Sequence, residues 1–192
     1  ADTYNVAVGY DAGNAVTTAT HNTLIGALAG DSLTTGASNV AVGYGALTTD
    51  DVGQHNVAIG RDALSAQNIA SAANTYNTAV GSSAGAAVTT GTSNTLIGGL
   101  AGNANTTGGN NTFVGKSAGV ANTTASSNTF VGERAGTANT TGDESVAVGQ
   151  FAYSANTTGV DNVAIGRSAL AANTTAHNNV AIGRSALLAN TT

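Results

Sequence analysis

Short apolar triplets that end at a glycine recur along the whole chain, with small or polar residues between them. The residue before each triplet is asparagine, or once serine, at Asn5, Asn22, Asn39, Asn56, Asn77, Asn94, Asn111, Asn128, Ser145, Asn162 and Asn179. Successive repeats begin 17 residues apart, except that Asn56 and Asn77 are 21 apart. This pattern predicts a single repeat domain over residues 1–192, with a four-residue insertion within 65–76.

Numbering each repeat from position 1 at this first residue, position 5 is glycine and position 8 is alanine in all eleven copies. The triplet is too short for a helical period, and an invariant glycine indicates a backbone turn. Self-similarity at a fixed period is typical of stacked coils. We therefore predict an all-β fold, a parallel β-solenoid (β-roll) of eleven 17-residue coils with two short strands per coil. At about 4.8 Å per coil the rod is roughly 50 Å long.

The triplets are apolar on both faces of the expected strand. Positions 2 and 4 point to one side and position 3 to the other. The interior of the solenoid covers one face, and strands that are apolar on both faces are normally covered on both. We therefore expect the chain to form oligomers, with these strands at the shared centre.

Positions 3 and 9 vary in a complementary way. Where position 3 is Leu24, Leu96, Phe113 or Phe130, position 9 is glycine, and where position 9 is leucine or tyrosine, position 3 is alanine. Close packing disfavours both voids and overlaps, so the two positions are expected to fill one compartment. The alternative is that duplicated copies have simply inherited linked residues.

Composition excludes several classes of function. Charged residues make up 8% of the chain and aromatic residues 4%, cysteine is absent, and the formal net charge is -5. This charge argues against a nucleic-acid partner, and no apolar run is long enough for membrane insertion. We find no nucleophile with a base and an orienting group, no phosphate-binding loop and no convergent carboxylates. The sequence thus predicts a protein that is not an enzyme and has no cofactor.

Paired threonines near the end of each repeat form the candidate binding surface. In strand geometry only one member of each pair faces solvent. The structural interpretation is that threonine and asparagine hydrogen-bond between coils and suit turns. The functional one is a flat, uncharged face, interrupted by Asp50 and Asp51 in the third repeat. The residues are Thr17, Thr18, Thr34, Thr35, Thr89, Thr90, Thr106, Thr107, Thr123, Thr124, Thr140, Thr141, Thr157, Thr158, Thr174, Thr175, Thr191 and Thr192.

Charged side chains gather at the corners of the repeat. Position 6 carries Arg61, Lys116, Arg167 and Arg184, and position 7 carries Arg134. We interpret them as a solvated edge, with a carbohydrate-contacting strip as the alternative. Asp50, Asp51 and Asp62 are acids that can bind a cation but are more often solvated. The three histidines are too scattered along the rod for one site, so we expect no metal. The repeated Asn-Thr-Thr triplets match the glycosylation sequon, which we attribute to duplication.

The repeats resemble two groups of fibrous proteins. Asn162-Val163-Ala164-Ile165-Gly166 is similar to head repeats of trimeric autotransporter adhesins, and the stretches 111–124 and 128–141 resemble phage tail-fibre repeats. The adhesin resemblance implies a left-handed β-roll in a homotrimer, although the 17-residue step is longer than the usual adhesin step. It further implies an extracellular or virion-associated segment that binds an external surface such as a glycan or a host cell envelope. The threonine column also resembles the faces of β-solenoid antifreeze proteins, so ice binding is the alternative function.

Overall fold

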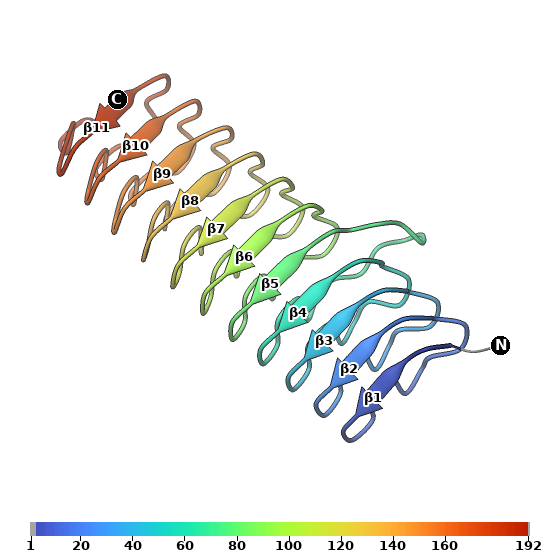
Figure 1. Ribbon diagram of the computed structural model, residues 1–192. Coiled ribbons are helices and arrows are strands. Elements are labelled where there is room, and N and C mark those ends of the chain that lie inside the picture. The colour runs from blue at the N-terminus through green and yellow to red at the C-terminus, as the bar shows by residue number, and fades with distance from the viewer. Residues whose placement is uncertain (1–2, 192) are drawn as a thin grey trace.

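The computed structural model describes residues 3–191, which form a straight stack of coils with one three-residue strand in each (Figure 1). Every strand is an apolar or threonine-containing triplet between the position 1 residue and the position 5 glycine. The strands are β1 (Val6–Val8), β2 (Thr23–Ile25), β3 (Val40–Val42), β4 (Val57–Ile59), β5 (Thr78–Val80), β6 (Thr95–Ile97), β7 (Thr112–Val114), β8 (Thr129–Val131), β9 (Val146–Val148), β10 (Val163–Ile165) and β11 (Val180–Ile182).

The strands form one parallel sheet in chain order, from β1 to β11. Equivalent positions pair throughout, as in Val163 with Val180. The register survives the longer step, since Val57 of β4 pairs with Thr78 of β5. Figure 1 shows a larger loop between these two strands, and residues 70–74 within it are all exposed. The parallel β-solenoid with 17-residue turns is thus confirmed, and each repeat position becomes a column along the rod.

The prediction of two strands per coil is wrong. In the second half of the coil the chain turns too tightly for an extended ladder. The Thr34 carbonyl accepts hydrogen bonds from three consecutive N–H groups of the preceding coil, those of Thr17, Thr18 and Ala19, at 3.1–3.2 Å. Coils are therefore hydrogen-bonded along this half as well, without the regular alternation of a strand.

The glycine at position 5 is required by both its backbone angle and its neighbour. Gly115 has φ of 136°, where L-residues are strained, and a Cβ there would lie 2.5 Å from the Gly132 carbonyl oxygen of the next coil. Gly99, at position 6, has no atom within 4 Å of such a Cβ. The invariant column thus marks a point of close backbone approach between coils.

The core lies inside the coils and is built from positions 3, 8 and 9, joined by Leu33 and Val88 at position 12. A Cβ on Gly119 would lie 2.5 Å from the Phe113 ring, so the large residue at position 3 occupies the space that position 9 leaves. The expected sharing of one compartment is confirmed, and it extends across coils. Coil 5 has small residues at both positions, and Leu96 of coil 6 reaches the space beside Gly85. The Phe113 and Phe130 rings stack at 5.0 Å.

Two columns of asparagine line the interior beside this apolar core. At position 1, the Asn39 N–H donates to Asn22 Oδ1 at 2.8 Å, and Asn39 Nδ2 donates to the Gly53 carbonyl at 2.9 Å. At position 12, Asn122 Nδ2 donates to Asn105 Oδ1 at 2.9 Å. Because each amide both donates and accepts, the columns satisfy most of the buried polar groups from coil to coil, with Asn56 Nδ2 and Asn190 Nδ2 as exceptions. They also bury the sequon asparagines from Asn105 to Asn173, which leaves their amides inaccessible for glycosylation in the folded chain.

The stretch from residue 3 to residue 191 contains no helix with the length and apolar character that crossing a membrane demands.

Candidate functional site

Three columns on the outside of the rod are candidates for binding: the threonine pairs, the outer side of the strands, and the edge at positions 6 and 7. The sequence singled out the first. Position 14 is exposed in every threonine-bearing coil that the structure describes, as predicted for one member of each pair. These residues are Thr18, Thr35, Thr90, Thr107, Thr124, Thr141, Thr158 and Thr175. Thr192, the last residue of the candidate set, lies outside the described residues.

The position 13 threonines are mostly half-buried and serve the fold. The Thr140 hydroxyl donates to the Thr157 carbonyl of the next coil at 2.9 Å, and Thr157 repeats the bond to Thr174 at 3.1 Å. Similar bonds link the other members of the column, so their hydroxyl protons are directed along the rod. The equivalent residues are Thr17, Thr34, Thr89, Thr106, Thr123 and Thr174, and the members at the two ends of the column, Thr17 and Thr191, are exposed.

The exposed threonines form one uninterrupted run in six successive coils, from Thr90 to Thr175. Val52 takes the place of threonine in coil 3, and coil 4 carries the insertion, so Thr18 and Thr35 are separated from this run. At one coil every 4.8 Å or so, the hydroxyl and methyl groups repeat at the strand spacing. The arrangement is a regular array without charge, because the charged Asp51 lies outside the run.

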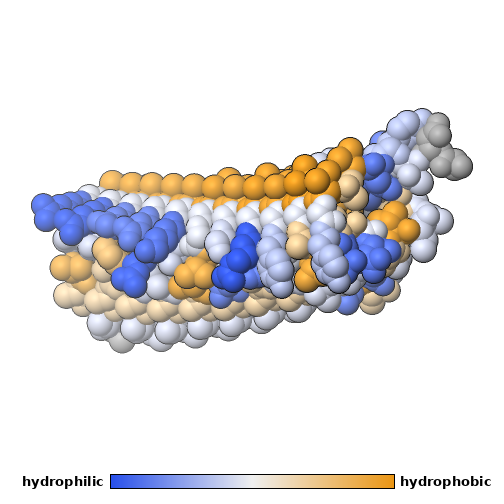
Figure 2. Space-filling model, turned by 90° about the horizontal axis from the view of Figure 1, so that it is seen from below, coloured by the Kyte–Doolittle hydropathy of each residue, from blue (hydrophilic) through white to orange (hydrophobic). Residues whose placement is uncertain are grey.

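The outer side of the strands forms an apolar ridge, which we define as the position 4 column from Val8 to Ile182. Position 3 faces the core, whereas position 4 faces outward and is half-buried or exposed, with Ile97 39% exposed. Every member is valine or isoleucine. Figure 2 shows an unbroken apolar row that runs along the rod beside a row of near-neutral colour. Exposed apolar residues that line up in this way are unusual for a surface in water.

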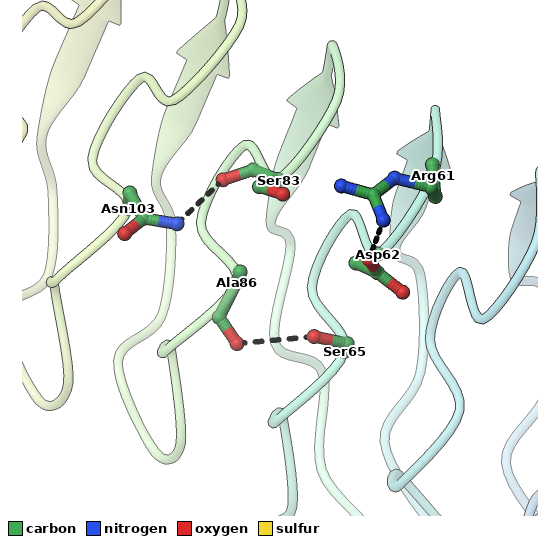
Figure 3. Close-up of polar contacts among 6 residues, drawn as sticks. All are labelled: Arg61, Asp62, Ser65, Ser83, Ala86 and Asn103. Carbon is green, nitrogen blue, oxygen red and sulfur yellow. Dashed lines mark hydrogen bonds and ion pairs between the residues drawn. The ribbon is translucent and has the colours of Figure 1, made fainter.

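Positions 6 and 7 form the charged edge of the rod. Several of its side chains contact one another. Glu133 accepts a hydrogen bond from Gln150 Nε2 at 2.9 Å, and the Arg134 guanidinium lies 5.8 Å from the centre of the Phe151 ring. Arg61 lies 3.4 Å from the Asp62 carboxylate (Figure 3).

A shallow open notch of about 490 Å³ lies on this edge. It is lined by Arg61, Ser82, Ser83, Gly99, Leu100 and Lys116. The notch exists because coils 5 and 6 carry serine and glycine at position 6, between the long side chains of coils 4 and 7. Sequence reasoning interpreted the cations as a solvated edge, with a carbohydrate-contacting strip as the alternative, and missed the notch. The signal for it was the two small residues that lie between Arg61 and Lys116 in the position 6 column.

The aspartates that were considered for a cation do not form a site. Asp50 is fully buried, and its carboxylate accepts hydrogen bonds from Gln67 Nε2 at 2.6 Å and from the Gly53 N–H at 3.0 Å. Burial raises the pKa of Asp50. Asp62, by contrast, pairs with Arg61 on the outer edge. Between residues 3 and 191, no three histidine or acidic side chains come close enough to hold a metal ion.

The histidines take part in local contacts. His21 stacks on Tyr4 at 5.2 Å, and His55 lies 5.4 Å from Tyr76. His177 Nδ1 accepts a hydrogen bond from the Val160 N–H at 3.0 Å.

Burial also raises the pKa of Tyr153, whose hydroxyl donates to the Gly159 carbonyl at 2.9 Å inside the core. The histidines and this tyrosine are each accounted for by packing between coils.

A comparison of the chain with models of known families, with curated proteins and with solved structures finds no match. The geometry of the three columns therefore has to support any functional conclusion.

Proposed function

We propose that this chain is a non-catalytic, rod-shaped segment of an extracellular or virion-associated fibre, which associates with copies of itself and presents its threonine surface to an external surface. The observation that carries the proposal is the apolar ridge, which extends through all eleven coils. A fibre segment needs a stiff rod and a way to bundle, and a solenoid with a continuous apolar column supplies both. The resemblance of the repeats to adhesin heads and tail fibres supports the same function, and it favours three copies.

The ridge is a suitable interface because it is regular and apolar. Parallel copies would share the same coil spacing of about 4.8 Å. The valine and isoleucine side chains of one copy would therefore pack between those of another. Covering this column removes apolar surface from water, which is the main favourable contribution in most protein association. The threonine array lies on another column and stays exposed when the strands are covered.

The oligomeric state of ridge variants tests this proposal. We expect the wild-type chain to have a multiple of its 18.4 kDa monomer mass by light scattering at micromolar concentration. The combined substitutions Val80→Lys, Val114→Lys and Val148→Lys should give a monomer that keeps its circular dichroism spectrum. The matched control, Thr107→Lys, Thr124→Lys and Thr141→Lys, places the same charge on the threonine column and should stay oligomeric. A monomeric wild type would refute self-association through the ridge.

Ice binding is the second candidate, and the uninterrupted run of six exposed threonines favours it. The run is uncharged, lies on a hydrogen-bonded backbone and repeats at a fixed interval, which are the features of a surface that orders water. The position 13 hydroxyls are directed to carbonyls of the next coil, so the exposed position 14 residues would make the contacts.

Thermal hysteresis and ice-shaping measurements test this candidate. If the array binds ice, Thr141→Tyr with Thr158→Tyr should abolish the activity, because bulky rings interrupt the flat surface. The matched control is Gln150→Tyr with Arg167→Tyr, at position 6, where tyrosine already occurs as Tyr10 and Tyr44. An inactive wild type, or equal effects of both pairs, rules out this candidate and leaves the fibre proposal intact.

A further inference from the structure

We propose that the notch at positions 6 and 7 binds an extended acidic oligosaccharide that lies along the rod, with its acidic groups at Arg61 and Lys116. This site is separate from the threonine column and from the apolar ridge, so the proposal does not depend on either.

The two cations of the notch differ from the other cations of this edge in lying on either side of one hollow, and both are available to a ligand. Within the described part of the chain, no carboxylate pairs with the Lys116 ammonium group. Arg61 has one partner, Asp62, in an exposed pair of a kind that contributes little and is easily replaced. In Figure 3 the Arg61 guanidinium extends from its own coil toward Ser83 of the next coil, which is into the notch. Two available cations at the ends of one hollow are a basis for binding acidic groups.

The spacing of the cations selects an extended ligand. Arg61 and Lys116 occupy the same position in coils 4 and 7, three steps apart, so their backbones are separated by about 14 Å. A single phosphate or sulfate ion would occupy only part of this separation. A chain of sugar rings that carries an acidic group on each or every second ring can span it, and it would follow the straight edge of the rod.

The floor of the notch suits the faces of sugar rings. Leu100 is 42% exposed there, and Gly99 beside it has no side chain, so a ring can approach the backbone closely. Within residues 3–191 the hydroxyls of Ser82 and Ser83 make no hydrogen bond to another residue, and both are free to bond to sugar hydroxyls. The Ser83 backbone is held by its own N–H bond to the Arg61 carbonyl at 2.8 Å and by Asn103 Nδ2 at 3.1 Å (Figure 3).

A second observation on the same edge points to a glycan. Position 6 carries Tyr10 in coil 1 and Tyr44 in coil 3, which are 75% and 56% exposed in a chain with few aromatic residues. They are two steps apart, about 10 Å, close to the distance between alternate rings of an extended β-1,4-linked glycan. Tyrosine offers a flat apolar face with a polar tip, which suits the apolar face and the hydroxyls of a sugar ring. The edge from coil 1 to coil 7 thus forms one strip.

The acids near the strip limit the affinity that is expected for an acidic ligand. Asp62 and Glu133 flank the two cations, and the whole chain carries a net charge of -5. We therefore expect weak binding per site that falls as salt concentration rises. Multiple copies of the chain in a fibre would raise the overall avidity.

Calorimetry or glycan-array binding with defined hexasaccharides tests the proposal, with mannuronate (a β-1,4-linked polyuronate), chondroitin sulfate and neutral cellohexaose as probes. We expect an acidic hexasaccharide to bind and cellohexaose to bind at least tenfold more weakly. Chondroitin sulfate carries sulfates in addition to carboxylates, so its binding relative to that of mannuronate shows whether sulfate groups add to the affinity. Arg61→Gln with Lys116→Gln should weaken binding at least tenfold, whereas the matched control Arg167→Gln with Arg184→Gln should leave it unchanged. Tyr44→Ala should weaken it without changing the salt dependence.

Several results would overturn the proposal. They are the absence of binding by both acidic probes, equal binding of cellohexaose, or equal losses in the two arginine and lysine variant pairs. Equal binding of poly-glutamate would show a general attraction for polyanions in place of a glycan site. All four substituted positions are exposed, so thermal melts of the variants are expected to match the wild type, and binding is compared only among variants that do.

Discussion

Single residues in this protein are constrained mainly by what lies directly above and below them. Position 12 shows how. In coils 6 to 10 it is a buried asparagine whose Nδ2 donates to the carbonyl three residues later, as Asn105 does to Gly108 at 2.9 Å. In coil 3 the same position holds Asp50, which lacks this donor and carries a charge in a buried site. An asparagine at position 12 can donate this hydrogen bond, whereas the Asp50 carboxylate has no proton to donate there.

Asp50→Asn is therefore expected to stabilise the protein. The new side chain keeps the bond from the Gly53 N–H to its oxygen, and its amide group can donate to the Gly53 carbonyl. These bonds and the removal of the buried charge offset the loss of the bond that Gln67 Nε2 donates to the second carboxylate oxygen. At neutral pH the gain in the free energy of unfolding should be about 1–3 kcal/mol, the range for correcting a mismatched buried polar group. Chemical denaturation monitored by circular dichroism measures it. Asp161→Asn, an exposed substitution on the same rod, is the control and should change the stability little.

The gain should depend on pH in a definite direction. Burial raises the pKa of Asp50 above its ordinary value of 3.8, so the folded chain holds this proton more tightly than the unfolded chain does. Below pH 3.8 Asp50 is protonated, so the folded wild type has no buried charge there. Its free energy of unfolding then falls as pH rises through the raised pKa of Asp50. The difference between variant and wild type should be smallest in acid and constant above the raised pKa. A difference that is independent of pH would contradict this account.

At the scale of the element, a coil has one strand, one shared interior compartment and a set of turns. The strand is only three residues long, so it contributes little by itself. The coil is stabilised because its backbone is hydrogen-bonded to both neighbours and its compartment is filled. Positions 3 and 9 fill it in either of two ways, with a large residue on the strand or with one on the opposite turn. Both types occur side by side, as in coils 8 and 9, with Phe130 beside Gly136 and Ala147 beside Tyr153.

Converting one type of coil into the other tests this account. Phe130→Ala should cost about 3–5 kcal/mol in the free energy of unfolding, and Gly136→Leu about 1–3 kcal/mol from overpacking against the Phe130 ring. The double variant resembles coil 10, where Leu170 adopts φ of 49° at position 9. We expect it to recover at least half of the loss of Phe130→Ala. Urea denaturation of the four proteins gives the coupling, and additive effects would show that the two positions do not share a compartment.

At the scale of the whole molecule, the coils form a straight rod with different chemistry on each long side. The valine and isoleucine ridge, the exposed threonines and the cation-bearing edge are parallel lines. Figure 2 shows the apolar row and the hydrophilic side chains of the edge on one face, so a copy that covers the ridge has to leave the edge accessible if both surfaces act together. The rod also has two ends, where β1 and β11 each have a strand partner on one side only.

Small-angle X-ray scattering distinguishes the two ways in which such rods can associate. If the ridge mediates assembly, the cross-section should increase with oligomerisation while the long dimension stays near 50 Å, the length of eleven coils. Association through β1 and β11 would at least double the long dimension and leave the cross-section unchanged. The second result would contradict the ridge as the interface, and the Val80→Lys, Val114→Lys and Val148→Lys variant provides the monomeric reference.

Much of this fold could be predicted from the sequence because a repeat turns a local pattern into a global one. The position of each strand, the parallel order, the role of the position 5 glycines and the pairing of positions 3 and 9 all follow from residues a few places apart. The same stacking rule predicted that threonines would form a column. Each of these features depends on the period and on side-chain volume, which are visible in the chain itself.

Only the tertiary structure shows which side chains are buried with hydrogen-bond partners and which are exposed to solvent. The sequence suggested a second strand, but the chain turns there, and the Thr34 carbonyl accepts hydrogen bonds from three successive N–H groups. It did not distinguish the inward asparagines of position 12 from the outward threonines beside them, nor reveal the hollow between Arg61 and Lys116. Burial and hydrogen bonding depend on the direction of each backbone turn in space, and residue order by itself does not specify that direction.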